Sequence, residues 1–290
     1  MEQLESIREQ TYRNWQLFVS DDGSTDETLA ILHNFQASLA PGQMEIFDGP
    51  RRGFAANFMS LLLNPSIESS YYAFSDQDDF WCGDKLSEAV SKLKSLSGQQ
   101  DKPAVYASAR TLVDDDLKPI GKEGARRLIP SFKNALAQNI AGGNTIVLNE
   151  KMRAILLKIG AIEVVSHDWW IYLVCTGADG IFYYDEEPHL LYRQHSNNVI
   201  GSGFSSGARL NRLRQFCGGR YRRWIDINLN ALERSKWALT NNNVVTMEKL
   251  ASLRDKPAPS RVLELLQSGI HRQSWLGTAG LFLACLLKMI

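Results

Sequence analysis

The order of apolar and amphipathic segments is the feature that most constrains how this chain can fold. Strand-like runs cover Leu17–Ser20, Met44–Phe47 and Tyr71–Ser75, and segments with apolar residues at helical spacing separate them. Strands that alternate with helices predict an α/β fold with a doubly wound, mostly parallel sheet. In such a sheet, ligands bind beyond the carboxyl ends of the strands.

The regular alternation weakens after about residue 105. The apolar run Val105–Val113 and the acidic turn Asp114–Asp116 predict a hairpin. Ile181–Tyr184 and His189–Arg193 predict two more strands, and a helix is expected to begin at His167. We therefore expect the α/β domain to extend over residues 1–204.

The last part, residues 205–290, is predicted to be a helical extension that is first basic and then apolar. Six arginines lie between Arg209 and Arg223, which suits either a solvated helical face or attraction to anionic lipid. Ser274–Leu287 contains no charged residue. It is shorter than the roughly 20 residues of a membrane span, so it is either a buried terminal helix or an interfacial anchor.

Composition narrows the partners and the compartment. The formal net charge is zero, so no general electrostatic attraction to nucleic acid is expected. The four cysteines form no CxxC pair, which favours a reducing compartment over a disulfide framework. The first residues contain no apolar signal segment. We expect a cytoplasmic protein, with a possible place at the inner face of the cell membrane.

An acidic cluster follows the third predicted strand in the segment AFSDQDDFW. Asp76, Asp78 and Asp79 repel one another unless a cation joins them, and oxygen ligands suit Mg²⁺ or Mn²⁺. A calcium loop counted from Asp76 is excluded, because Trp81 and Ser87 occupy the positions that need glycine and glutamate. The alternative is an acidic turn before a helix, where carboxylates are also favoured.

A second acidic pair, Asp21-Asp22, ends the first predicted strand. A carboxylate there can accept hydrogen bonds from a base or a ribose hydroxyl, and Gly23 lets the backbone approach a ligand. Turn and cap residues have the same composition, so this pair alone is weak. Together with the second acidic strand end it predicts a nucleotide pocket.

Four motifs in this order resemble those of the family 2 inverting glycosyltransferases, which have the GT-A fold. They are SDDGSTDET, SDQDDFW, the HDWW helix and YRQHSNNVIG, and the resemblance covers residues 1 to about 205. The HDW form and the YRQHSN segment are similar to the rhamnosyltransferase-like branch of the family.

The resemblance implies a role for each matching residue in donor binding. Asp21 and Asp22 correspond to the pair that contacts base and ribose, and Asp76 and Asp78 correspond to the DxD motif, with Asp78 as metal ligand. The family usually has N-x-G before its third helix, whereas this chain has Arg-Arg-Gly, so Arg52 is expected to contact phosphate.

The later motifs imply the catalytic and acceptor residues. Asp168 corresponds to the catalytic base, which takes the proton of the acceptor hydroxyl; the alternative is that it caps its own helix. His195 is expected beside the diphosphate and the metal, although it also suits a surface loop. Trp169 and Trp170 are candidates for stacking on an acceptor sugar, and at least one is expected in the core because adjacent helical residues face different sides.

One departure concerns the first strand. The family begins with an apolar strand in the interior of the sheet, and that strand is missing here, which would leave two neighbouring strands with unpaired edges. The expected function is metal-dependent transfer of a hexose, such as rhamnose from a dTDP donor, to a cell-surface polysaccharide or a lipid-linked glycan. A UDP-hexose donor and a catalytically impaired scaffold that binds sugar nucleotides are the alternatives.

Overall fold

The computed structural model describes residues 1–122, 128–194 and 219–290. Its strands are β1 (Leu17–Asp21), β2 (Met44–Asp48), β3 (Tyr71–Ala73), β4 (Phe80–Trp81), β5 (Ala104–Val113), β6 (Pro119–Lys122), β7 (Val147–Asn149) and β8 (Ile181–Arg193). Its α-helices are α1 (Glu2–Arg8), α2 (Thr28–Ala37), α3 (Phe54–Leu62), α4 (Lys85–Gln100), α5 (Phe132–Ala135), α6 (Glu150–Ile159), α7 (His167–Gly177), α9 (Arg220–Arg234), α10 (Asn241–Ser252), α11 (Ala258–Ser268) and α12 (Trp275–Leu286). Short 3₁₀ helices are η1 (Gly143–Thr145), η2 (Lys236–Ala238) and η3 (Leu253–Asp255).

The strands form two sheets of different size. β1 and β2 pair in parallel as a two-stranded sheet, and the larger sheet has the order β3-β7-β5-β8-β4 with β6 paired to β5. In the larger sheet only β5 and β8 run parallel, and the other pairs are antiparallel. The α/β class is confirmed, but the sheet is mixed, so the expected mostly parallel arrangement is wrong.

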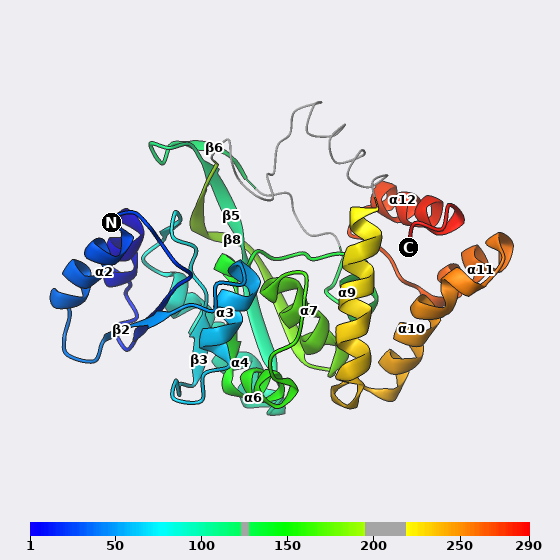
Figure 1. The fold of residues 1–290 in the computed structure, drawn as a ribbon, viewed down its shortest axis with the longest axis horizontal. Helices are drawn as coiled ribbons and strands as arrows, with labels where there is room; N and C mark the ends of the chain where they lie inside the picture. Colours follow the sequence, from blue (N-terminus) through cyan, green and yellow to red (C-terminus); the bar gives the residue numbers. More distant parts are fainter. Residues whose placement is uncertain (123–127, 195–218) are drawn as a thin grey trace.

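The described residues contain no strand that joins β1 to β3. β1 pairs with β2 alone and β3 with β7 alone, so each has one edge without a strand partner in the described chain. This agrees with the expectation that the sheet lacks an interior strand. The region of β1, β2 and α2 lies at one end of the molecule (Figure 1). It has its own small core around Leu32, Phe35 and Met44.

Helix α7 lies at the centre of the main core. Nine of its eleven residues are buried, and it packs between the large sheet and α9 (Figure 1). The sequence predicts the start of this helix at His167, and the structure confirms it. Its core contacts fix the direction in which its first turn points.

Two segments of β structure differ from expectation. The two predicted strands near the end of the α/β domain are one strand, β8, with register irregularities opposite Ser108 and Ala109 of β5. The two-residue strand β4 was not predicted, because Phe80 and Trp81 are too few to show a period. β4 pairs with β8, so the chain that directly follows the acidic segment is part of the large sheet.

The C-terminal part is helical, as expected, with α9 to α12 on one side of the molecule (Figure 1). The predicted boundary at residues 204/205 and the arginines Arg209, Arg212 and Arg214 lie outside the described residues. Within the described chain, no helix combines the length and apolar character needed to cross a membrane.

Candidate active site

The acidic segment forms the connection between β3 and β4. Asp76 and Asp78 are half-buried, and Asp79 is buried and accepts a hydrogen bond from Nδ2 of Asn144. Burial raises the pKa of Asp76 to about 6, with the charges of Asp78 and Asp168 adding to the effect. Burial also raises the pKa of Asp79 to about 7, and the charge of Asp76 adds to it. The segment is therefore a site of carboxylates held close together against their repulsion.

Helix α1 holds this segment in place. Gln3 Nε2 donates to Ser75 Oγ at 2.6 Å, and Ser6 Oγ accepts from the backbone N–H of Trp81 at 3.1 Å. The side chain of Gln10, just past the helix, accepts from Leu86 N at 3.0 Å and donates to Cys82 O at 2.7 Å. These bonds hold the chain on both sides of the acidic residues.

Asp168 lies in the first turn of α7, on the same site. Its charge raises the pKa of Asp76, so the structure brings the DxD segment and the predicted base together. The N-cap of α7 is Ser166, and Asp168 Oδ1 accepts from the N–H of Trp169 at 2.6 Å. One carboxylate oxygen of Asp168 therefore bonds the backbone at the start of its own helix, as the capping alternative predicts in part.

The Asp21-Asp22 pair orders two loops. Asp21 accepts from the N–H groups of Gly23 and Ser24. The pKa of Asp21 is lowered, chiefly by hydrogen bonding with the Ser24 side chain and further by these backbone bonds. Asp22 accepts from the N–H groups of Arg51 and Gly53. Each carboxylate thus makes backbone bonds typical of turns, and these leave lone pairs for a ligand.

The Arg-Arg-Gly turn is exposed beside this pair. Arg51 has a φ of 55°, Gly53 has a φ of 87°, and Gly53 is the N-cap of α3. Arg52 is exposed, and its contact with phosphate stays a prediction.

Arg193 connects the YRQ segment to the acidic segment. Its Nε donates to the carbonyl oxygen of Asp78 at 3.2 Å, and its Nη2 forms an ion pair with Glu2 at 2.6 Å. His195, two residues later, lies outside the described residues. In the described part of the motif, Arg193 makes the contact with the acidic segment.

Two side chains that the sequence analysis did not single out complete the site. Arg110, from β5, lies over the Tyr192 ring at 4.4 Å, and its charge lowers the pKa values of Asp76 and Asp79 against the effect of burial. Lys85 is fully buried, and Asp79 and Asp76 act on its charge. Arg110 is distant from the acidic motif in sequence, and Lys85 occupies an ordinary helix position, so no local pattern identifies them.

His167 is a further buried polar residue, next to Asp168. Its ring packs against Phe58 and Phe74, with centroid distances of 4.4 and 4.9 Å. Within the described chain neither ring nitrogen has a hydrogen-bond partner, and burial lowers the pKa of the imidazole. The neutral ring thus serves as packing behind the first turn of α7.

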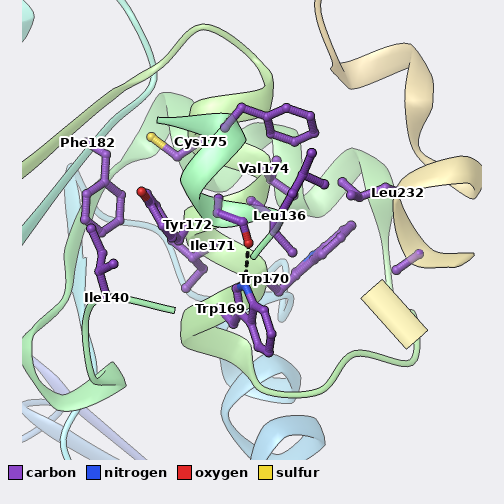
Figure 2. Packing of buried hydrophobic residues seen from close by; sticks show 14 of the residues in the cluster. Leu136, Ile140, Trp169, Trp170, Ile171, Tyr172, Val174, Cys175, Phe182 and Leu232 are labelled. Carbon is purple, nitrogen blue, oxygen red and sulfur yellow. Dashed lines mark hydrogen bonds between the residues drawn. The ribbon is translucent and has the colours of Figure 1, made fainter. Parts of the chain in front are cut away.

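The expectation that a tryptophan of the HDWW helix stacks on an acceptor is wrong for both residues. Trp169 is 5% and Trp170 0% exposed, and both rings lie in the main core (Figure 2). Trp169 Nε1 also donates to the carbonyl oxygen of Ala135 at 2.7 Å, the dashed bond in Figure 2. Asp168 lies on the face of α7 that points to the site. The side chains of Trp169 and Trp170 therefore point into the core.

The residues of the acidic segment fit a divalent cation in chemistry but do not form a complete cage. In the described part of the chain, no group of three His, Cys, Asp or Glu side chains is arranged to hold a metal ion. The charge of Asp78 raises the pKa of Asp76, and the buried Oδ1 of Asp79 has no hydrogen-bond partner in that part. Both features suit a cation that would relieve the repulsion. Such an ion would take its other ligands from substrate phosphates.

Comparison with known proteins places this arrangement among sugar transferases. A family model described as glycosyl transferase family 2 matches residues 2–155. The chain is 33% identical over 244 residues to the dTDP-rhamnosyl transferase RfbG of Shigella flexneri, which covers 80% of each protein. It is 27% identical over 128 residues to the amylovoran biosynthesis glycosyltransferase AmsB of Erwinia amylovora, covering 41% of this chain and 42% of that one. Among solved structures, TarS 1–349 of S. aureus has a similar fold, with a TM-score of 0.50 and 13% identity over 92% of this chain and 76% of that one.

Proposed function

Because the chain belongs to glycosyl transferase family 2 and is a glycosyltransferase with the GT-A fold, we propose that it transfers a hexose from a nucleoside diphosphate sugar with inversion. The observation that carries this proposal is the approach of two acidic motifs. Asp168 acts on the pKa of Asp76, although the two are 92 positions apart in sequence. A donor held at the DxD segment would then face a carboxylate on α7.

In the proposed reaction Asp168 acts as general base. Its carboxylate takes the proton of an acceptor hydroxyl while the hydroxyl oxygen attacks the anomeric carbon. The bond from that carbon to the diphosphate breaks, so the nucleoside diphosphate leaves with the electron pair. The donor's base and ribose are bound by Asp21 and Asp22, whose backbone bonds already order the surrounding loops.

We assign the cation, Mg²⁺ or Mn²⁺, to Asp78, with Asp76 as a neighbour that binds the nucleotide sugar and His195 as the expected additional ligand. When bound, it would neutralise the charge on the leaving diphosphate. The protein's own contribution is to hold the carboxylates in place through Asn144 and helix α1, and to provide positive charge from Arg110.

The donor is proposed to be dTDP-rhamnose, since the relative whose alignment covers 80% of this chain is named as a dTDP-rhamnosyl transferase. A UDP-hexose is the runner-up. The acceptor is proposed to be a growing cell-surface polysaccharide or a lipid-linked glycan at the cytoplasmic side of a membrane, which the region 205–290 would contact.

A second candidate function is a scaffold that binds sugar nucleotides without transferring sugar. The observation that favours it is the separation of β1 and β2 from the large sheet, because the predicted nucleotide pocket lies across that break. The two functions differ in chemistry and share the binding step.

The test is an assay with a panel of dTDP and UDP sugars in the presence of Mn²⁺, with and without EDTA. Release of nucleoside diphosphate by the wild type, and its loss in Asp168→Asn at unchanged nucleotide affinity, is the expected result. The matched control is Asp185→Asn, since Asp185 on β8 bonds Tyr106 outside the site. Nucleotide binding without turnover of any donor would favour the scaffold, and absence of both would overturn each proposal.

A further inference from the structure

Helix α12 has an apolar face that the protein does not cover. Leu276 is 64%, Leu283 56% and Leu287 58% exposed, and these residues follow one another at helical spacing. Trp275 at the start of the helix is 73% exposed and Leu286 near its end is 47% exposed. Large apolar side chains gathered on one face mark an interaction surface.

The orientation of this face is set by packing on the other side of the helix. Leu281, Ala284 and Cys285 are buried against the rest of the C-terminal region. Ser274 caps the helix, with its Oγ accepting from Gly277 N at 3.1 Å. The exposed leucines therefore lie on a helix that is already folded and anchored.

Positive charge lies beside the apolar face. Lys288 follows the C-cap of the helix and is exposed. Arg222 Nη1 donates to its carbonyl oxygen at 3.5 Å, which brings the start of α9 next to the end of α12. Arg220 and Arg223, on either side of Arg222, are exposed as well.

Acidic residues of the neighbouring helices do not cancel these charges, because they are paired elsewhere. Asp226 of α9 forms an ion pair with Arg254 at 2.5 Å, and Glu264 of α11 pairs with Lys256. Segment Ser274–Leu287 itself contains no charge. The surface thus combines an uncharged apolar stripe with a cationic end.

We propose that this face of α12 lies in the headgroup region of an anionic lipid bilayer, with its leucines and Trp275 in the acyl boundary. A tryptophan at one end and cations at the other match the preferences of helices that lie in the membrane plane. A stripe of aliphatic side chains without charged groups specifies no protein partner, whereas a bilayer requires only apolar area and charge. This inference refines the membrane contact of the proposed function, and its test requires no catalytic turnover.

The test is co-sedimentation of the full chain with vesicles of phosphatidylcholine alone and of equimolar phosphatidylcholine and phosphatidylglycerol. The wild type is expected to bind the anionic vesicles and to be released by high salt. Leu276→Gln combined with Leu283→Gln is expected to lower the partition coefficient at least tenfold. Arg223→Gln combined with Lys288→Gln is expected to lower it about tenfold, and on anionic vesicles only.

The matched control is Ile120→Gln combined with Leu29→Gln, which removes two apolar side chains that are 59% and 39% exposed and lie on β6 and α2, away from α12 (Figure 1). It is expected to bind like the wild type. Melting temperatures establish that each variant is folded. Equal binding by the α12 variants would overturn the proposal, and so would a wild-type dimer that the leucine variants dissociate, since the face would then join two copies. Sugar release from the donor in solution, measured in parallel, separates this outcome from failure of the proposed function.

Discussion

The ammonium group of Lys85 lies 3.9 Å from the centre of the Trp81 ring, fully buried next to the acidic segment. Nζ has no hydrogen-bond partner in the part of the chain that the structure describes. Burial lowers the pKa of Lys85 to about 7, and the charge of Asp79 opposes that shift. The carboxylates of the acidic segment and the face of the Trp81 ring therefore stabilise the charge of this buried lysine.

This relationship predicts an unusual dependence of stability on pH. The unfolded chain binds the Lys85 proton up to about pH 10, whereas the folded chain releases it near 7, so wild-type stability rises across that window. Lys85→Met has no proton to release. Relative to the wild type it is expected to lose about 3 kcal/mol of free energy of unfolding between pH 7 and 10. Urea denaturation at several pH values measures the difference.

The control for Lys85 is Lys92→Met on the same helix, because Lys92 lies over the Tyr183 ring at 4.0 Å but is half-exposed. Lys92→Met measures the effect of losing a lysine–ring contact at a position where the lysine is not fully buried. Parallel stability curves for Lys85→Met and wild type would contradict the prediction.

Asp76→Asn is expected to stabilise the metal-free protein at pH 8 and to abolish transfer. Burial raises the folded pKa of Asp76 to about 6, so the folded state holds the proton more tightly, and wild-type stability falls as pH rises from about 4 to 6. The variant avoids that loss. Its advantage at pH 8 is expected to be about 2 kcal/mol and to disappear near pH 4.

Asp26→Asn is the sign control for this experiment. The pKa of Asp26 is lowered, chiefly by its hydrogen bond with Thr28, so its contribution to stability is present above pH 4 and is lost as pH falls. Asp26→Asn should therefore be slightly less stable than wild type at pH 8. The same trend for both variants would mean that burial does not govern Asp76.

Gly143→Ala is expected to disturb the site through His167. A Cβ at this position would lie 2.1 Å from His167 Nε2, and Phe58 and Phe74 prevent the ring from moving aside. We expect a loss of about 3 kcal/mol in unfolding free energy and a lower transfer rate, because Asp168 follows His167.

The matched control is Gly280→Ala in α12, where a Cβ meets nothing within 4 Å. Removing a helical glycine there should be neutral or stabilising by up to about 1 kcal/mol. Thermal and urea unfolding compare the two variants. A Gly143→Ala protein as stable as Gly280→Ala would show that the core around His167 adapts.

Asp22→Ala should weaken nucleotide binding by about tenfold, since it removes the acceptor for the N–H groups of Arg51 and Gly53. Isothermal titration with dTDP and UDP measures the effect. Asp48→Ala is the control, because Asp48 is exposed and sits opposite Asp21 at the end of the adjacent strand. Equal losses for both variants would indicate general disturbance of the two-stranded sheet.

Elements with a strong local period were predictable from sequence. The strands at Leu17 and Met44, the helix that follows Gly53 and the helix that starts at His167 all have their expected places. The direction of strand pairing was not, because β5 pairs with β7 and β8 across long stretches of chain and nothing in a single strand specifies its neighbour.

The acidic residues of the site were predictable because they cluster at strand ends. Lys85 was not, since a lysine in the first turn of a helix normally faces water, and only the fold buries it. Arg110 lies in β5 and reaches the site through sheet pairing. The inward direction of Trp169 depends on how α7 is packed, which its own sequence does not determine.

The hydrogen bonds from α1 to the acidic segment also bear on the order in which contacts form during folding. Gln3 meets Ser75 at a separation of 72 residues, and Gln10 meets Leu86 at 76. One side of α1 packs against nearby chain, because Leu4 lies in the cluster of Leu32, Phe35 and Met44. Its other side packs against distant chain, since Ile7 lies in the cluster of Trp81, Leu86 and Leu190. Closing that long loop is the step that we expect to limit folding, because distant contacts form late.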